Sequence, residues 1–284
     1  QERVDRAVAG GVPLERLILD PGHDLNKNTL HSLELTRRLD EIVADAVEAG
    51  RLRFVVGAAQ AAAVSDVVFL CVPTPQDADG SADLSYIEAA ATEIAPVLQS
   101  GAVVVNKSTV PVGSAKVVER VLQRDDVSVV SNPEFLREGS AVHDFLNPDR
   151  VVIGCDDAAA AQRVASLYRS LETEILITDA ASAETIKYAA NGYLAMKISF
   201  VNAVAALCEA VGADVQHVID GIGSDHRIGR AFLRPGPGWG GSCFPKDSRA
   251  LVSIAAQHGY DFSMMRGVIA VNDEQRERMI RKIV

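Results

Sequence analysis

Short apolar runs rich in β-branched residues alternate with stretches of helical periodicity through roughly the first two thirds of the chain. The run DVVFLCVPTP at residues 66–75 is continuous, as expected of a strand buried on both faces of a parallel sheet, and it stops at prolines that cannot donate to a strand ladder. This alternation predicts an α/β fold with a doubly wound, Rossmann-like parallel sheet. The other predicted strands cover residues 14–22, 51–56, 102–110, 127–135 and 150–155, and the helices cover 30–50, 84–99 and 110–122.

Strand signals stop after residue 179, and helical character continues for about 30 residues. Apolar and small side chains dominate this segment, so we expect one long helix that is buried in a domain or subunit interface. Shorter helices are predicted at residues 215–222 and 246–258. The second part of the chain is therefore expected to form an all-helical domain.

Three polar, turn-rich segments follow predicted strands, and they read VPTP, KST and NPEFLREG. In a doubly wound sheet the ligand binds beyond the carboxyl ends of the strands, so these segments should converge on one crevice. Glu134 and Glu138 in the third segment stand four residues apart and would share a face if a helix begins there. The alternative is an ordinary pair of acids at a helix start, which the helix dipole favours.

Composition narrows the class of protein. Of the 284 residues, 48% are hydrophobic and 23% are charged, as in a soluble globular protein, and the net charge of −10 disfavours a nucleic-acid partner. We expect no membrane span and no signal peptide. Four cysteines without a CxxC motif argue for a reducing, cytoplasmic setting and against a disulfide framework or a metal site. Three of them, Cys71, Cys155 and Cys208, fit structural thiols better than reactive ones.

The fourth cysteine, Cys243, stands in the loop PGPGWGGSCFPKD, residues 235–247. Glycines let the backbone adopt unusual conformations and approach a ligand closely, so this loop is able to wrap around a bulky group beside the thiol. The alternative, a surface loop with an incidental cysteine, is about equally consistent with this motif alone. A nucleophilic Cys243 would need nearby positive charge, for which Lys187 and Lys246 are candidates.

Lys187 and Asn191 lie one helical turn apart on the long helix and therefore share a face. A lone lysine on a helix more often extends its ammonium into solvent. The Asn191–Gly192 pair lowers helix propensity, which favours a functional reason for its presence.

The motifs taken together resemble the UDP-glucose 6-dehydrogenase family over about residues 39–284. They occur in that family's order and spacing, and GDP-mannose dehydrogenases share the architecture. The phenylalanine after the cysteine is more similar to the UDP-glucose branch. The motifs are VPTP, NKSTVPVG, SNPEFLREG, NPDRVVIG, AETIKYAANGYLAMKISFVN, RIG, FLRPGPGWGGSCFPKD and GVIAVN.

The resemblance implies NAD-dependent oxidation of the sugar C6 alcohol to a carboxylate in two steps. Cys243 would add to the intermediate aldehyde as a thiohemiacetal, and hydride loss would leave a thioester that water hydrolyses. Lys187 and Asn191 would stabilise the oxyanion, Asp247 and Thr109 would place water and protons, and Glu134 would be the base.

The resemblance also assigns residues to ligands. The implied cofactor-binding residues are Val72, Pro73, Thr74, Ser108, Thr109 and Glu138. The implied substrate-binding residues are Glu134, Phe135, Leu136, Arg137, Glu138, Lys187, Asn191, Arg227, Arg234, Gly236, Gly238, Trp239 and Gly240, with Arg227 reaching in from a neighbouring subunit. The expected assembly is a homodimer through the long helix that starts near Ser182.

The chain departs from the family in its first part. No GxGxxG turn precedes the strand at residues 66–75, and we expect a C-terminal nucleotide-sugar domain to lie outside the chain. Residues 1–40 resemble a fragment of dihydropteroate synthase, through ILDPG at residues 18–22. The expected domains are therefore this fragment, a truncated NAD-binding domain at 41–180 and a helical central domain at 181–284. The alternative function is a non-catalytic chain that keeps only the dimerisation scaffold; a GDP-mannose dehydrogenase is a minor alternative.

Overall fold

The computed structural model describes residues 44, 47–75, 82–137 and 139–283. The chain divides into two compact units. The first unit contains Gln1–Thr74 and Asp83–Lys187, and the second contains Pro75–Ala82 and Tyr188–Val284. The strand predicted at residues 14–22 and most of the helix predicted at 30–50 lie outside the described residues.

The first unit is built on a five-stranded sheet in the order β1-β2-β3-β4-β5. Strands β1, β2 and β3 are parallel, as are β4 and β5. Strand β4 runs antiparallel to β3, so the prediction of a wholly parallel sheet is wrong at this junction. The strands are β1 (Val67–Leu70), β2 (Val103–Asn106), β3 (Ser128–Ser131), β4 (Arg150–Gly154) and β5 (Glu174–Thr178).

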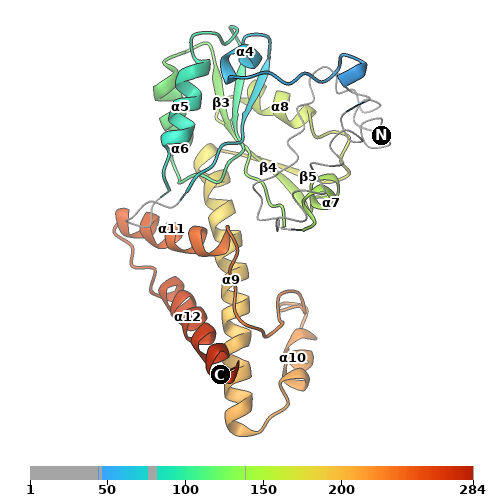
Figure 1. Ribbon diagram of the computed structural model, residues 1–284, viewed down its shortest axis with the longest axis vertical. Coiled ribbons are helices and arrows are strands. Elements are labelled where there is room, and N and C mark those ends of the chain that lie inside the picture. The colour runs from blue at the N-terminus through green and yellow to red at the C-terminus, as the bar shows by residue number, and fades with distance from the viewer. Residues whose placement is uncertain (1–43, 45–46, 76–81, 138, 284) are drawn as a thin grey trace. The chain divides into compact units, whose positions relative to one another are not determined.

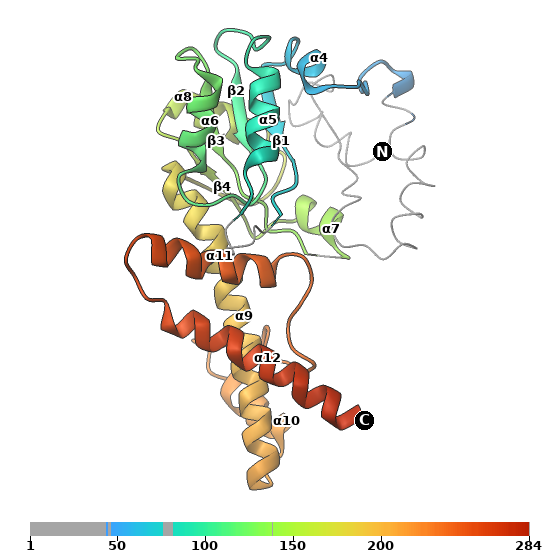
Figure 2. The same ribbon diagram turned by 60° about the vertical axis from the view of Figure 1, so that its left-hand side comes forward.

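Helices cover both faces of this sheet, which confirms the α/β, Rossmann-like fold class (Figures 1 and 2). One apolar core joins a sheet face containing Val104 to α5 and α6, and another joins the opposite face, containing Val105, to α8. All residues of β2 are buried, whereas β1 is mostly half-buried, because β1 is the last strand of the described sheet on its side. The helices of this unit are α4 (Ala58–Ala62), α5 (Ser85–Ile94), α6 (Ser114–Leu122), α7 (Ala141–Leu146) and α8 (Ala158–Ser166).

Two local predictions are wrong. Residues 51–56 form no strand: Leu52 is buried, but Phe54 and Val56 are exposed, and none of the described strands pairs with this segment. No helix begins in the described part of NPEFLREG either, because residues 132–137 are irregular and α7 starts at Ala141. Glu134 is therefore not part of a helix, and Glu138 lies outside the described residues.

The second unit is helical, as predicted. Helix α9 (Ala180–Val211) has 32 residues and continues from the first unit into the second. Its start is capped by Asp179, which accepts hydrogen bonds from the backbone N–H and hydroxyl of Ser182. The second unit also contains α10 (Val215–Gly223), α11 (Phe244–Gln257) and α12 (Ser263–Ile283), and the last of these was not predicted. Trp239 and Met265 are buried in its main apolar core.

Helix α9 is long and apolar enough to cross a membrane by length and composition alone. Only 28% of its most apolar window is buried within the chain. Much of the apolar surface of α9 is therefore exposed in the single chain, and the prediction that α9 packs in an interface refers to this surface.

Gly154 sits where β4 meets the start of α9. A Cβ atom built on Gly154 would lie 2.4 Å from the Cβ of Ala183 and 2.7 Å from the carbonyl oxygen of Asp179. Both neighbours belong to short or backbone groups that cannot move aside, so we expect Gly154→Ala to lower the free energy of unfolding by about 1–3 kcal/mol in urea denaturation. Gly221→Ala is the control, since a Cβ atom added to this residue of α10 would meet nothing within 4 Å. Equal stability of Gly154→Ala and wild type would contradict the packing argument.

Candidate functional site

The residues singled out from the sequence fall into two groups, one in each compact unit. In the first unit the loops after β1 and β2 are joined by hydrogen bonds. The hydroxyl of Ser108 donates to the carbonyl of Val72 at 2.7 Å, and that of Thr74 donates to the carbonyl of Thr109 at 2.9 Å. The prediction that the VPTP and KST segments converge beyond the strand ends is therefore confirmed.

Lys187 is buried rather than solvated. Only 3% of its side chain is exposed, and its ammonium contacts Glu134 Oε1 at 3.0 Å as well as the Glu134 carbonyl. The other carboxylate oxygen of Glu134 accepts the backbone N–H of Leu136 at 2.6 Å. The guanidinium carbon of Arg150 lies 3.7 Å from the centroid of the Phe135 ring, and Lys187 Nζ lies 5.4 Å from the same centroid. Burying an ion pair costs free energy unless its geometry and further hydrogen bonds compensate for the lost hydration. The Lys187–Glu134 pair therefore depends on the surrounding fold to hold both side chains in place.

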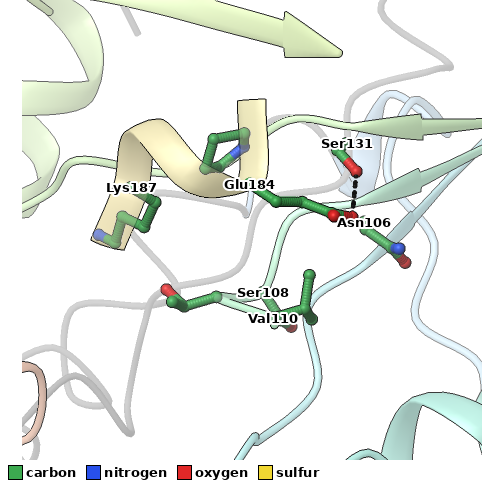
Figure 3. Close-up of a pocket in the computed structure, with 8 residues that line it drawn as sticks. Asn106, Ser108, Val110, Ser131, Glu184 and Lys187 are labelled. Carbon is green, nitrogen blue, oxygen red and sulfur yellow. Dashed lines mark hydrogen bonds between the residues drawn. The ribbon is translucent and has the colours of Figure 1, made fainter. Parts of the chain in front are cut away.

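A small pocket lies between the carboxyl ends of β2 and β3, the residues that follow them, and the first turns of α9 (Figure 3). It brings Ser108, Thr109 and Lys187 together, as the sequence predicts. It also contains Glu184, which sequence reasoning passed over because an acid in a helix usually faces water. The lining residues are Asn106, Ser108, Thr109, Val110, Ser131, Pro133, Glu184 and Lys187.

A second lysine, Lys107, is half-buried and was not singled out from the sequence. Its ammonium donates to Asn132 Oδ1 at 3.0 Å and to the Tyr168 hydroxyl at 3.3 Å. Burial lowers the pKa of Lys107 to about 8, and burial also raises the pKa of Tyr168. The available signal was its position directly after a buried strand, beside Ser108.

In the second unit the Cys243 loop is held by side chains from α9 and α12. Gly238 has φ +108°, a conformation that favours glycine, and the amide of Asn272 both accepts from the Trp239 N–H at 2.8 Å and donates to the Trp239 carbonyl at 3.0 Å. The Trp239 indole N–H donates to Ser199 Oγ at 2.8 Å. Trp239 is consequently buried, and the glycine-rich loop has a defined shape.

Gly236 is fixed at the other end of the same loop. Its N–H donates to Asn202 Oδ1 at 2.8 Å, and its carbonyl accepts from Gln275 Nε2 at 2.7 Å. A Cβ atom added to Gly240 would meet nothing within 4 Å. Gly236 and Trp239 are thus anchored by α9, while Gly240 has open space around it.

Cys243 is half-buried and occupies the N-cap position of α11. Four residues on, Asp247 is 1% exposed and accepts from Asn191 Nδ2 at 2.6 Å and from the Lys246 ammonium at 2.7 Å. Asp247 thus links Asn191 to the first turn of α11, where the Asp247 N–H donates to the Cys243 carbonyl at 2.8 Å. A carboxylate and an amide held together near a helix N-terminus can orient a carbonyl and handle its proton.

The other cysteines are separate from this cluster. Cys208 is buried, as predicted, and Cys155 is half-buried with its pKa raised by burial. Cys71 is exposed, so the prediction that it is a core thiol is wrong; it follows the last residue of β1, where the chain leaves the sheet.

Two predicted substrate-binding arginines already have carboxylate partners. Arg137 donates from both its backbone and its guanidinium to Asp144, which lowers the pKa of that carboxyl. Arg227 is paired with Asp225 and is 77% exposed. Arg227 thus keeps most of its side chain accessible to solvent although it is paired with Asp225.

Comparison with protein families gives two matches. Residues 23–172 match the NAD-binding domain of the UDP-glucose/GDP-mannose dehydrogenase family, and residues 181–274 match its central domain. The first match begins within the segment likened to dihydropteroate synthase, and that likeness finds no support. Residues 1–40 otherwise lie outside the described structure.

Individual proteins and structures agree with the family match. UDP-glucose 6-dehydrogenase of Rhizobium meliloti is 51% identical over 87% of this chain and 59% of its own length. The enzyme of Pseudomonas aeruginosa is 42% identical over 100% of this chain and 60% of its own length. The structure of a UDP-glucose dehydrogenase from Pyrobaculum islandicum superposes with a TM-score of 0.78 at 41% identity, covering 84% of this chain and 57% of that one. The chain thus spans about three fifths of these relatives.

Gly238 and Gly240 provide a matched pair for testing the loop. A Cβ on Gly238 would lie 2.6 Å from Asn272 Oδ1, and the positive φ adds strain, so we expect Gly238→Ala to cost about 1–3 kcal/mol of stability. The maleimide labelling rate of Cys243 should change as well, measured by peptide mass spectrometry. Gly240→Ala should leave both quantities close to wild type. Identical behaviour of the two variants would refute the anchoring by Asn272.

Proposed function

This chain belongs to the UDP-glucose/GDP-mannose dehydrogenase family, and on that premise we propose that the protein oxidises the C6 alcohol of UDP-glucose to a carboxylate with NAD⁺. Relatives at 42–51% identity are named UDP-glucose 6-dehydrogenases, which supports this sugar nucleotide over GDP-mannose. The observation that carries the proposal is the hydrogen bond from Asn191 to Asp247 in the first turn of α11, the helix that Cys243 N-caps.

Cys243 acts as the nucleophile in this proposal. Its sulfur forms a bond to C6 of the intermediate aldehyde, and the carbonyl oxygen takes a proton to complete a thiohemiacetal. Loss of a hydride from C6 together with the hydroxyl proton then gives a thioester. Water attacks the thioester carbon, the C–S bond breaks, and the thiolate is released with the carboxylate product.

The neighbouring groups serve the oxygen and the protons. The amide of Asn191 and the ammonium of Lys187 stabilise the oxyanion. The backbone N–H groups at the start of α11 add to the positive electrostatic potential there. Glu134 removes a proton from the attacking water, while Asp247 and Thr109 orient it. Each of these groups is held by the hydrogen bonds described above, which supports their assignment.

The loops after β1 and β2 fit the nicotinamide side of NAD⁺. Val72, Thr74, Ser108 and Thr109 are tied together at the carboxyl edge of the sheet, where doubly wound folds bind dinucleotides. Pro73 and Glu138 belong to the same proposed lining. When bound, NAD⁺ accepts the hydride that leaves C6 in each oxidation.

Substrate contacts come from two segments. Phe135, Leu136 and Arg137 follow β3, and the sugar nucleotide is also held by the Cys243 loop through Arg234, Gly236, Gly238, Trp239 and Gly240. The exposed guanidinium of Arg227 reaches the site of a second copy of the chain.

The partner is a second copy of this chain, bound through α9. Tyr193, Phe200, Leu207 and Val211 are each 54–66% exposed and are spaced by seven, seven and four residues, so they form one apolar stripe. An apolar stripe of this kind needs a partner surface. A cytoplasmic setting accords with the free state of the cysteines in the described part of the chain.

Replacing the sulfur tests the covalent route. We expect Cys243→Ser to lower NADH production from UDP-glucose and NAD⁺ by about a thousandfold or more, because the nucleophile is removed. NAD⁺ affinity, measured by calorimetry, should stay within about twofold. Cys155→Ser is the control, since a serine can keep the contact that Cys155 makes with the Val129 carbonyl.

Undiminished turnover by Cys243→Ser would eliminate the covalent route. A wild-type chain that neither binds millimolar NAD⁺ nor oxidises UDP-glucose supports the alternative of a non-catalytic scaffold. Turnover of GDP-mannose in preference to UDP-glucose would reassign the substrate.

Leu207→Glu tests the dimer. A carboxylate in the middle of the apolar stripe should convert the dimer to a monomer at micromolar concentration, as measured by light scattering after gel filtration. Tyr86→Glu, at an exposed position on α5, should leave the mass unchanged. A monomeric wild-type chain, or a dimeric Leu207→Glu variant, would contradict the assembly.

A further inference from the structure

Glu184 is a buried carboxylate to which neither the motifs nor the proposed chemistry assigns a role. It lies in the first turns of α9 and is 3% exposed. Its Oε2 accepts the backbone N–H of Gly113 at 2.6 Å. Its Oε1 accepts the backbone N–H of Ala115 at 3.0 Å and the hydroxyl of Ser131 at 2.9 Å (Figure 3). All three partners are hydrogen-bond donors.

These contacts replace a missing helix cap. Gly113 is the N-cap residue of α6, with φ +96°, and it has no side chain to bond the free N–H groups of the first turn. Glu184 supplies the acceptor from a segment 71 residues away. Burial raises the pKa of Glu184, and the hydrogen bonds from α6 and Ser131 oppose that rise. Within the described structure its charge is met by the helix N-terminus and a hydroxyl rather than by a cation.

The cap links two segments that carry proposed chemistry. Ser108, Thr109 and Val110 lead into α6 and line the same pocket as Glu184. On the other side, Lys187 follows Glu184 by nearly one turn of α9. The carboxylate of Glu184 thus contacts the element that follows Thr109 and belongs to the helix that carries Lys187.

We propose that Glu184 is a positioning residue, which caps α6 from α9 and thereby fixes the Thr109 loop relative to Lys187. It contacts neither substrate nor cofactor. The catalytic consequence rests on the proposed function, in which Thr109 and Lys187 handle water and the oxyanion. The mechanical consequence, a fixed loop, does not depend on that function.

Glu184→Gln is the sharpest test because it preserves volume. A glutamine amide must present N–H donors to one side of a site whose partners all donate, so one or more of the three bonds is lost. We expect hydrogen exchange of the peptide covering residues 107–116 to speed up about tenfold or more, with exchange in β4 and β5 unchanged. The kcat for UDP-glucose should fall about tenfold or more, with little change in KM, because ground-state binding is intact.

Two further variants complete the experiment. Ser131→Ala removes one donor and keeps both backbone bonds, so its effects should be smaller than those of Glu184→Gln. Glu119→Gln, an exposed carboxylate on α6 itself, should behave as wild type in both assays.

The outcomes separate the two proposals. Unchanged exchange at residues 107–116 in Glu184→Gln would overturn the cap, whatever the activity. Faster exchange with wild-type kcat would overturn the positioning role. An inactive wild-type chain would reject the proposed function, and the exchange measurement would still decide whether Glu184 fixes the loop.

Discussion

The main constraint on this structure is that the polar side chains buried along α9 must find partners. Glu184, Lys187, Asn191, Ser199 and Asn202 are each at most 8% exposed, and they follow one another at intervals that keep them on one stripe of the helix. An unpartnered buried polar group costs free energy, and each of these side chains bonds a specific segment through at least one of its polar atoms. Those segments are the start of α6, the Glu134 turn, Asp247, Trp239 and Gly236.

The segments anchored in this way are the ones that carry the candidate chemistry. An irregular loop gains little order from its own residues, and glycine-rich loops gain least. Here the thiol-bearing loop is ordered because Asn202, Ser199 and Asn272 satisfy its backbone and indole groups. Side chains of α9 and α12 can therefore hold the Cys243 loop, which would otherwise sample many conformations, as a preorganised site requires.

The local pattern of apolar residues was sufficient to predict much of the fold. The apolar runs located β1, β2 and β3, and the long stretch without strand signals located α9, because burial dictates residue type there. Which segments pair as strands, and in which direction, depends on tertiary contacts instead. Residues 51–56 have strand composition without a described partner strand, and the direction of β4 depends on neighbours that its own residues do not specify. Lys187 was found through a motif, whereas Glu184 has the same local appearance as a solvent-exposed acid and is identified only by its three donors.

Helix α9 has an exposed apolar stripe in addition to its buried polar one. Tyr193, Phe200, Leu207 and Val211 lie about half a helical turn away from the buried polar stripe, on the opposite side of the cylinder. Composition alone makes this helix long and apolar enough for a membrane. A lipid environment would nevertheless have to accommodate Glu184, Lys187 and Asn191, which are satisfied here by protein groups drawn from distant loops. A polar stripe matched to protein partners and an apolar stripe on the far side support the proposal that α9 serves both a domain core and an interface between protein chains.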